Sequence, residues 1–526
     1  MDRIAARAWV GRALFLAWFI LLLLPSATVF FMGDADSRLA IAVSAGCFAI
    51  LWLAAGTRWF FILTYPLAFL SVLIVAADLL RGVDLVELAM LAGQVDAREA
   101  HYALSPYFVP IGVAALVLAT CAAIGFRVPY AMPRRRARVV ALIGLFGAAA
   151  VMAIATPSVM LRAWPLNAVS TQIAMAIGRS DFIAMALPWA PVSPRVSGAT
   201  WSATRAAGGA RRETYVVVVG EAVRADRLAA CGGQSFLALH QPVIVYCDVM
   251  SGASRTNISV PLLVSRDMPG APVRVSTDAT VLRAFEETGF RTYWISEQDQ
   301  ALAWADADVI RYTRPRSTIR RDLLPLVRSA LADAAPKKAL VLHTYDAHFP
   351  YCERFDAREA PAPVDCGRIG AIPADGRRRE WIAAYDDAVA EALAFLDGVI
   401  DQLRASGEEA FLVYTPDHAE NLLDDPRGLY FHALSMPTRF DTRVPMIFWA
   451  SESWRKDHPR EIQALEAHRN VPAMHADLVP TLLGAADIRY AEPRKDVVDL
   501  TRAAPGARTR WVEPRLGVAV DGDRLQ

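Results

Sequence analysis

Long apolar runs fill the first third of the chain, and shorter alternating runs fill the rest. Five stretches near the amino terminus are apolar over about the 20 residues that a bilayer core requires. They cover residues 9–32, 37–55, 58–80, 107–126 and 138–157. The pattern therefore predicts an N-terminal domain of five transmembrane helices over residues 1–158.

Basic residues predict the orientation of these spans, because cytoplasmic loops are enriched in Lys and Arg. They flank the first span, lie between the second and third, and recur in "RVPYAMPRRRAR" between the fourth and fifth. Five crossings from an inside N-terminus place the remainder of the chain outside the cytoplasm. We expect amphipathic interfacial segments in the loop 81–107 and after residue 160, the latter within a linker over residues 159–210.

From residue 211 to 526 the pattern changes to short apolar strands separated by helical stretches. Continuous runs such as "YVVVV", "ALVLHT" and "FLVYTP" are typical of strands buried on both faces. Their alternation with helices predicts an α/β fold, with a mostly parallel sheet sandwiched by helices.

Net charge and cysteine content indicate which kind of partner and which cellular compartment the chain favours. The net charge is +1 and the second domain has no dense basic stripe, which argues against a nucleic-acid partner. Four of the six cysteines lie in this domain, as an oxidising compartment would favour. Of the three connectivities we favour Cys231 with Cys247 and Cys352 with Cys366, because each pair closes a short loop; four reduced thiols are the alternative.

Candidate ligands follow the ends of predicted strands, where α/β sheets bind ligands. Glu221 follows "VVVVG", and the pair Asp417 and His418 follows "FLVYTP". A carboxylate leaving a buried strand is costly unless a cation compensates it, although Glu221 could instead cap a helix or pair with Arg224. Together the three residues provide the ligand types of a zinc site that keeps one position open.

Two further histidines lie near these strand ends. His348 stands in "YDAHFP" and His432 in "YFHALSMP". Either one alone is typical of an ordinary loop or core histidine. Beside a metal site they become candidate catalytic groups.

The stretch "SGASRTNISVP", residues 251–261, offers a hydroxyl group without an adjacent base. A hydroxyl bound to zinc has a lowered pKa and needs no separate base, so we expect Ser254 to be both metal ligand and nucleophile. A plain helix N-cap is the alternative role of Ser254, and Thr256 is the second candidate nucleophile.

The order of five motifs resembles that of bacterial lipid A phosphoethanolamine transferases, in the alkaline phosphatase and sulfatase-like superfamily. The motifs are "VVVVGEAVRADR", "SGASRTNISVP", "DAHFP", "YTPDHAENLLDDPRGLYFHALSMP" and "VPMIFWAS". The resemblance implies metal binding by Glu221, Asp417 and His418, with Ser254 in place of a family threonine. It also implies that His348 and His432 lie around the phosphoryl group or a second zinc, and that His475 belongs to a C-terminal motif.

Several positions depart from the family pattern. The nucleophile region of the family reads roughly S-C-G-T-A-T-A, whereas this chain has Gly252 for the cysteine, Ser254 for the first threonine and Arg255 for a small residue. The family's "DHGES" reads "DHAEN" here. Arg255 could clamp a phosphate oxygen or fit a different head group.

The resemblance implies a multi-pass protein of the bacterial inner membrane with a periplasmic catalytic domain and one or two zinc ions. It would move phosphoethanolamine from phosphatidylethanolamine to lipid A, lipopolysaccharide or a glycan through a covalent Ser254 intermediate. We expect a monomer whose other contacts are membrane lipids. The alternatives are a glycerol-phosphate transferase that uses phosphatidylglycerol and a membrane-anchored binding protein without catalysis. A sulfatase activity is disfavoured, because the C/S-x-P-x-R sequence is missing after Ser254.

Overall fold

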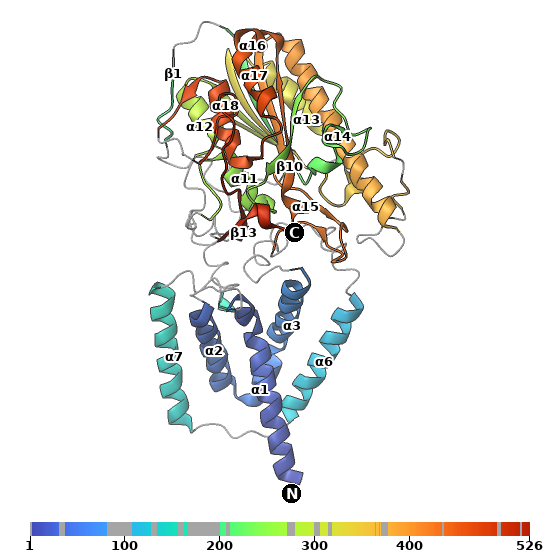
Figure 1. Ribbon diagram of the computed structural model, residues 1–526. Helices are drawn as coiled ribbons and strands as arrows, with labels where there is room; N and C mark the ends of the chain where they lie inside the picture. The colour runs from blue at the N-terminus through green and yellow to red at the C-terminus, as the bar shows by residue number, and fades with distance from the viewer. Residues whose placement is uncertain are drawn as a thin grey trace. The chain divides into compact units, whose positions relative to one another are not determined.

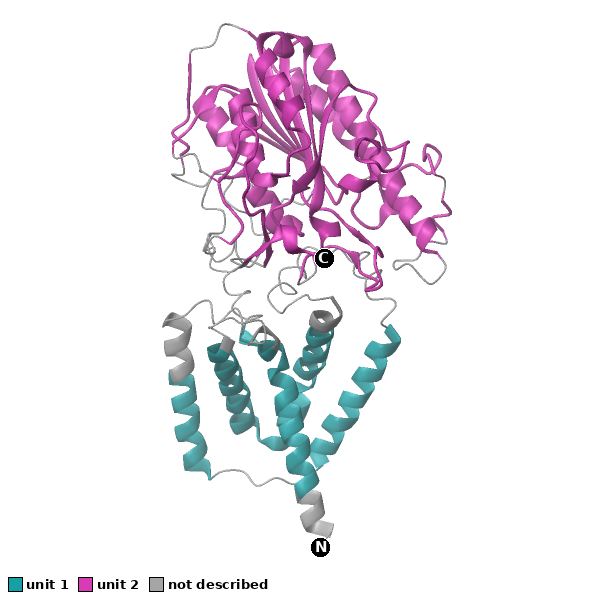
Figure 2. Cartoon of the chain, viewed as in Figure 1, with its two compact units in different colours: residues 1–190 teal, residues 191–526 magenta. Residues whose placement is uncertain are grey.

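The computed structural model divides the chain into two compact units, Met1–Ala190 and Pro191–Gln526 (Figure 2). It describes residues 3–30, 37–81, 108–127, 134–155, 163–166, 200–206, 211–270, 279–298, 306–313, 318–362, 364–367, 369, 377–433, 436–491, 496–515 and 518–526. The expected interfacial segments lie almost wholly outside these residues.

The first unit is helical. Its described helices are α1 (Arg3–Phe30), α2 (Ser37–Ala55), α3 (Thr57–Arg81), α6 (Phe108–Arg127) and α7 (Arg135–Ala155). In it α3 packs against α1 and α6, while α2 packs against α1 and α7 (Figure 1). Buried polar groups between these apolar helices are paired, as in the hydrogen bond of 2.9 Å from Trp18 Nε1 to Thr64 Oγ1.

Four helices of the described chain are long and apolar enough to cross a membrane, namely α1, α2, α3 and α6. The fifth expected span, residues 138–157, coincides with helix α7 but is not among these four. Three arginines, Arg135, Arg136 and Arg138, lie in the first turn of α7, and Arg138 donates to the carbonyl of Leu53 at 2.6 Å. The side chains of α7 are described only as far as Gly147, so a fifth span over residues 138–157 stays a prediction.

The second unit is built on an eight-stranded sheet, and its parallel character confirms the predicted fold class. The strand order is β11-β3-β10-β7-β2-β6-β4-β5. Only β10 runs against its neighbours β3 and β7; the other neighbouring pairs are parallel. These strands are β2 (Glu213–Gly220), β3 (Ile244–Met250), β4 (Arg291–Ser296), β5 (Val309–Tyr312), β6 (Lys337–His343), β7 (Glu409–Pro416), β10 (Arg443–Ala450) and β11 (Ala473–Met474).

Helices cover both faces of this sheet (Figure 1). Tyr215, Val217 and Val219 of β2 point into a core with α11 (Thr256–Val264), α12 (Val281–Glu287) and α18 (Leu478–Ala485). The alternate residues Val216 and Val218 point into a core with α13 (Ile319–Leu331) and α14 (Arg378–Ser406). Because both faces are covered, β2 is apolar at every central position, which is what the run "YVVVV" predicts.

Smaller elements complete the second unit. They are α15 (Arg439–Thr442), α16 (Glu452–Asp457), α17 (Pro459–His468) and the two-stranded pairs β1 (Thr204–Arg205) with β12 (Ile488–Arg489), β8 (Asn421–Leu422) with β9 (Tyr430–Phe431), and β13 (Trp511–Arg515) with β14 (Val518–Asp521). The expected disulfides Cys231–Cys247 and Cys352–Cys366 are both confirmed.

Candidate active site

The carboxyl ends of the adjacent parallel strands β2 and β7 bring three predicted ligands together. Glu221 directly follows β2, and Asp417 and His418 directly follow β7. The amide of Asp417 donates to the carbonyl of Gly220 at 2.9 Å, which fixes the two strand ends against each other. Neighbouring strands lie about 4.8 Å apart, so residues just beyond these ends reach a common point.

Gly220 allows the close packing beneath this point. A Cβ atom at this position would lie 2.5 Å from Asp346 Oδ2 and 2.6 Å from the hydroxyl oxygen of Tyr414. Tyr414 in turn donates to Asp346 at 3.0 Å. A side chain at residue 220 would push these buried groups apart, so the glycine that precedes Glu221 is required by space.

Glu221, Asp417 and His418 form a fully buried cluster whose ligand atoms all lie within 4.8 Å of one another. Nε2 of His418 lies 3.1 Å from Glu221 Oε1 and 3.4 Å from Asp417 Oδ2. Burial and the neighbouring Glu221 raise the pKa of Asp417 above its usual range. Burial acts to lower the pKa of His418, but the charges of Asp417 and Glu221 outweigh it and raise that pKa to about 10.

The chemistry of this cluster fits a divalent cation. Two buried carboxylates face one imidazole nitrogen, and Asp417 Oδ2 has no hydrogen-bond partner among the described residues. Two adjacent buried carboxylates are stable only with a proton or a cation between them. Two oxygens and one nitrogen match the ligand preference of zinc with one position left open.

The hydroxyl group that lies against this cluster belongs to Thr256. Its Oγ1 is 3.2 Å from Glu221 Oε2 and 3.3 Å from His418 Nε2. Thr256 is the first residue of helix α11, and the hydroxyl of Ser259 one turn later donates to the carbonyl of Asp417. Helix α11 is therefore anchored to the cluster from its first turn.

Ser254, the hydroxyl favoured by the sequence, is placed differently. It is fully buried, its Oγ has no hydrogen-bond partner in the described part of the chain, and its carbonyl accepts from the amide of Ala433. Thr256, the second candidate, is thus the hydroxyl with contacts to the cluster, and the role of Ser254 as nucleophile stays a prediction. Of the two threonines in the family pattern the chain retains the second, at Thr256.

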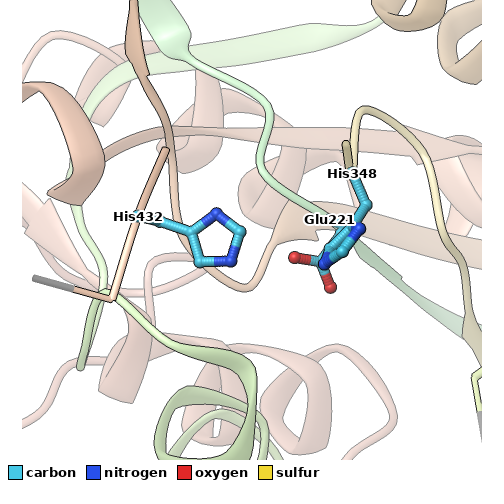
Figure 3. Close-up of side chains that lie close together, drawn as sticks. All are labelled: Glu221, His348 and His432. Carbon is cyan, nitrogen blue, oxygen red and sulfur yellow. The ribbon is translucent and has the colours of Figure 1, made fainter. Parts of the chain in front are cut away.

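Glu221 also belongs to a second group, with His348 and His432, whose ligand atoms likewise lie within 4.8 Å of one another. Figure 3 shows the ring of His432 facing Glu221 and His348 from the opposite side of the site. The ring centroids of His348 and His432 are 5.6 Å apart, and those of His418 and His432 are 4.1 Å apart. Burial, together with the charges of His418 and Arg255, lowers the pKa of His432 to about 3.

Two buried residues that the sequence did not single out orient these groups. Gln298 Nε2 donates to Glu221 Oε2 at 2.7 Å and to the carbonyl of Thr344 at 2.9 Å. Glu420 Oε2 lies 2.7 Å from His432 Nδ1, while its other oxygen accepts from the hydroxyl of Tyr351 at 3.0 Å. Gln298 follows strand β4, so its place at a strand end was the available signal.

His475 lies outside both groups. Its Nε2 is 3.2 Å from Thr415 Oγ1, and its Nδ1 accepts from the amide of Gly252 at 3.3 Å. Burial lowers the pKa of His475 to about 3, which keeps the ring neutral. Its contacts tie the turn before Thr256 to strand β7.

Comparisons with known proteins show the family of the chain. A family model described as "Sulfatase" matches residues 213–488, which is more than half of the chain. The chain is 24% identical over 329 residues to phosphoethanolamine transferase EptC of Escherichia coli K12, covering 57% of this chain and 55% of that protein. It is 25% identical over 311 residues to the Kdo(2)-lipid A phosphoethanolamine 7''-transferase of the same strain, covering 53% and 52%. The chain thus spans about half the length of the curated relatives it matches.

Solved structures show the same fold. The integral membrane lipooligosaccharide phosphoethanolamine transferase A of Neisseria meningitidis superposes with a TM-score of 0.58 at 17% identity, covering 92% of this chain and 95% of that one. The periplasmic domain of Escherichia coli EptC, crystallised in complex with zinc, gives 0.54 at 21% identity, covering 62% and 97%. The predicted resemblance to phosphoethanolamine transferases is confirmed.

Proposed function

Because the chain belongs to the sulfatase family and resembles phosphoethanolamine transferases, we propose that it transfers phosphoethanolamine from phosphatidylethanolamine to a cell-envelope acceptor. The acceptor class is lipid A, lipopolysaccharide or a glycan. The transfer proceeds in two steps through a covalent intermediate on Thr256.

The position of Thr256 carries this proposal. Its hydroxyl oxygen lies between Glu221 and His418, at 3.2 Å and 3.3 Å, and it opens helix α11. The amide groups at a helix N-terminus favour a phosphate anion. The hydroxyl therefore lies where a phosphoryl group would be attracted.

Glu221, Asp417 and His418 would hold a zinc ion, with Thr256 beside it. The ion would supply a lowered pKa for a neighbouring hydroxyl and a positive charge that offsets charge on the phosphoryl oxygens. Gln298 orients the carboxylate of Glu221 for this role.

In the first step, Thr256 Oγ1 bonds to phosphorus as the bond between phosphorus and the glycerol oxygen breaks. The proton of Thr256 passes to solvent, and His348 protonates the departing diacylglycerol oxygen. In the second step the acceptor oxygen bonds to phosphorus and gives its proton to the same histidine. The bond from phosphorus to Thr256 then breaks, and the hydroxyl takes up a proton from solvent.

We further propose that the second unit faces the periplasm and that the apolar helices anchor the protein in the inner membrane. The two disulfides support an oxidising compartment. Membrane anchoring raises the local concentration of a lipid donor at the site.

The test is to incubate the full-length protein in detergent with zinc and labelled phosphatidylethanolamine or phosphatidylglycerol, and to follow diacylglycerol release. Release from the ethanolamine lipid by the wild type, lost in Thr256→Ala, is the expected result. Release from the glycerol lipid alone would establish a glycerol-phosphate transferase. Metal binding without release from either lipid would indicate a binding protein.

A further inference from the structure

The loop that carries His432 has a strained backbone. Phe431 has φ 65° and Ala433 has φ 60°, so non-glycine residues flank the histidine on both sides in the left-handed region. Such conformations persist only where surrounding contacts hold them, and they concentrate at functional sites. The contacts that hold this loop therefore determine where the imidazole of His432 points.

Two hydrogen bonds join Ala433 to the turn that precedes Thr256. The amide of Ala433 donates to the carbonyl of Ser254 at 2.8 Å, and Arg255 Nη2 donates to the carbonyl of Ala433 at 3.3 Å. Arg255 is buried, and it directly precedes Thr256. The turn that precedes Thr256 and the loop that carries His432 are thus joined by one backbone hydrogen bond and by one from the side chain of Arg255.

His348, the other histidine beside Glu221, is held in the same manner as His432. Arg354 Nε donates to the carbonyl of His348 at 2.8 Å, and Nη2 donates to the carbonyl of Phe349 at 3.4 Å. The guanidinium lies 4.3 Å from the ring centroid of Tyr345, whose ring in turn contacts that of His348 at 4.6 Å. For each of the two histidines in Figure 3, an arginine therefore donates a hydrogen bond to the backbone carbonyl of the histidine itself or of the next residue.

We propose that Arg255 and Arg354 are positioning residues, which hold the imidazoles of His432 and His348 on either side of Glu221 at the separation that the transfer reaction requires. The proposal rests on the proposed function and deepens it. An arginine suits this task because its planar fork presents several fixed N–H groups at the end of an apolar stem, whereas a lysine offers a single mobile ammonium.

A double-mutant cycle tests whether Arg255 acts through His432. In the wild-type background, Arg255→Met should lower kcat for diacylglycerol release about 10- to 100-fold with KM for the lipid unchanged, because a small displacement of a catalytic group has effects of this size. In the His432→Gln background, Arg255→Met should lower kcat by less than about 2-fold. The kcat of Arg255→Lys should lie between those of Arg255→Met and the wild type.

The same cycle with Arg354→Met and His348→Gln tests the second half of the proposal. Arg427→Met is the matched control: Arg427 lies between β8 and β9 and also donates to a backbone carbonyl, that of Gln526 at 3.0 Å. It touches neither histidine loop in the part of the chain described, so kcat should stay within about 2-fold. If Arg255→Met lowered kcat equally in both backgrounds, general damage would be indicated and the proposal overturned. A raised KM with unchanged kcat would overturn it by indicating direct contact of Arg255 with substrate.

Hydrogen exchange gives a measurement that needs no turnover. The amide of Ala433 should exchange about 10-fold faster in Arg255→Met than in the wild type, and at the wild-type rate in Arg427→Met. Unchanged exchange would refute the positioning role. Faster exchange in a protein whose wild type releases no diacylglycerol would uphold the positioning of His432 and reject the proposed function instead.

Discussion

The hydroxyl oxygen of Thr256 lies 3.3 Å from Nε2 of His418, whereas Ser254, only two residues earlier, bonds through its backbone to Ala433. The change from extended backbone at Arg255, with φ −152°, to helix at Thr256 accounts for this difference. Thr256 is thereby directed to the cluster of Glu221 and His418. The start of helix α11 thus decides which of the two hydroxyls lies against this cluster.

Thr256→Ala should abolish formation of the covalent intermediate and lower the rate of diacylglycerol release by at least about 1000-fold, because no other atom replaces its oxygen. Thr256→Ser should keep activity within about 10-fold, since it retains the hydroxyl and loses only a methyl group that restricts its rotamers. Ser254→Ala is the control and should change the rate less than about 3-fold. Mass spectrometry of the peptide that contains both residues checks the assignment, and phosphoethanolamine on Ser254 would contradict it.

Gln298→Met should weaken zinc binding about 10- to 100-fold, because groups that orient a metal ligand have effects of this size. The substitution removes the donor to Glu221 Oε2 and leaves the carboxylate free to rotate. Competition with a chelator measures the affinity. Gln402→Met is the control, since Gln402 donates to the carbonyl of Leu324 between helices α13 and α14; an equal loss in both variants would contradict a specific role.

The sequence was sufficient to predict the architecture of the second unit. The run from Tyr215 to Val219 is apolar at every position because β2 is covered on both faces, and that pattern alone predicts a parallel sheet. In the membrane unit, the apolar runs predicted the four helices α1, α2, α3 and α6 that are long and apolar enough to span a bilayer. The disulfides followed from short loop closure.

The site was predictable only in part. Glu221, Asp417 and His418 each follow a strand, and the fold rule that collects strand ends sufficed to group them. Which of the hydroxyls of Ser254 and Thr256 lies against the cluster depends on the helix start, which hydrophobic patterns locate only within a few residues. Gln298 also lies near a strand end, after β4, but an amide side chain is not a usual zinc ligand, so it was not among the candidate ligands.

Lys338→Met should destabilise the second unit by about 3 kcal/mol, since it leaves part of a buried ionic network without its partner. Lys338 is fully buried and its Nζ lies 2.8 Å from Glu408 Oε1, which also accepts from Arg212 at 2.9 Å. The change lies at the amino ends of β6 and β7, opposite the candidate site, so zinc affinity should be unchanged. Thermal unfolding of the full chain in detergent measures the loss.

The double variant of Lys338→Met with Glu408→Gln should recover much of that stability, because it removes the second charge as well. Equal stability of Lys338→Met and the wild type would show that Arg212 alone compensates the charge of the Glu408 carboxylate. A loss of zinc affinity in Lys338→Met would contradict the separation between this network and the site.

Asp387→Asn should stabilise the protein at pH 8 and have little effect near pH 4. Asp387 is buried on helix α14; its Oδ1 accepts from the amide of Ala362 at 2.9 Å, and its Oδ2 has no hydrogen-bond partner among the described residues. Burial, with the nearby charge of Asp386, raises the pKa of Asp387 to about 6.

Between the ordinary pKa of an aspartate and about 6, the folded chain holds a proton on Asp387 that the unfolded chain has released. The protonated Asp387 therefore contributes fully to folding stability below the ordinary pKa of an aspartate. This contribution is lost as the pH rises through about 6. Asparagine keeps the acceptor for Ala362 and never ionises, so Tm should exceed that of the wild type by roughly 2 °C at pH 8, which corresponds to about 1 kcal/mol. The difference between variant and wild type is measured at both pH values, which cancels the titration of other groups. A variant less stable than the wild type at pH 8 would mean that the ionised carboxylate has a stabilising partner.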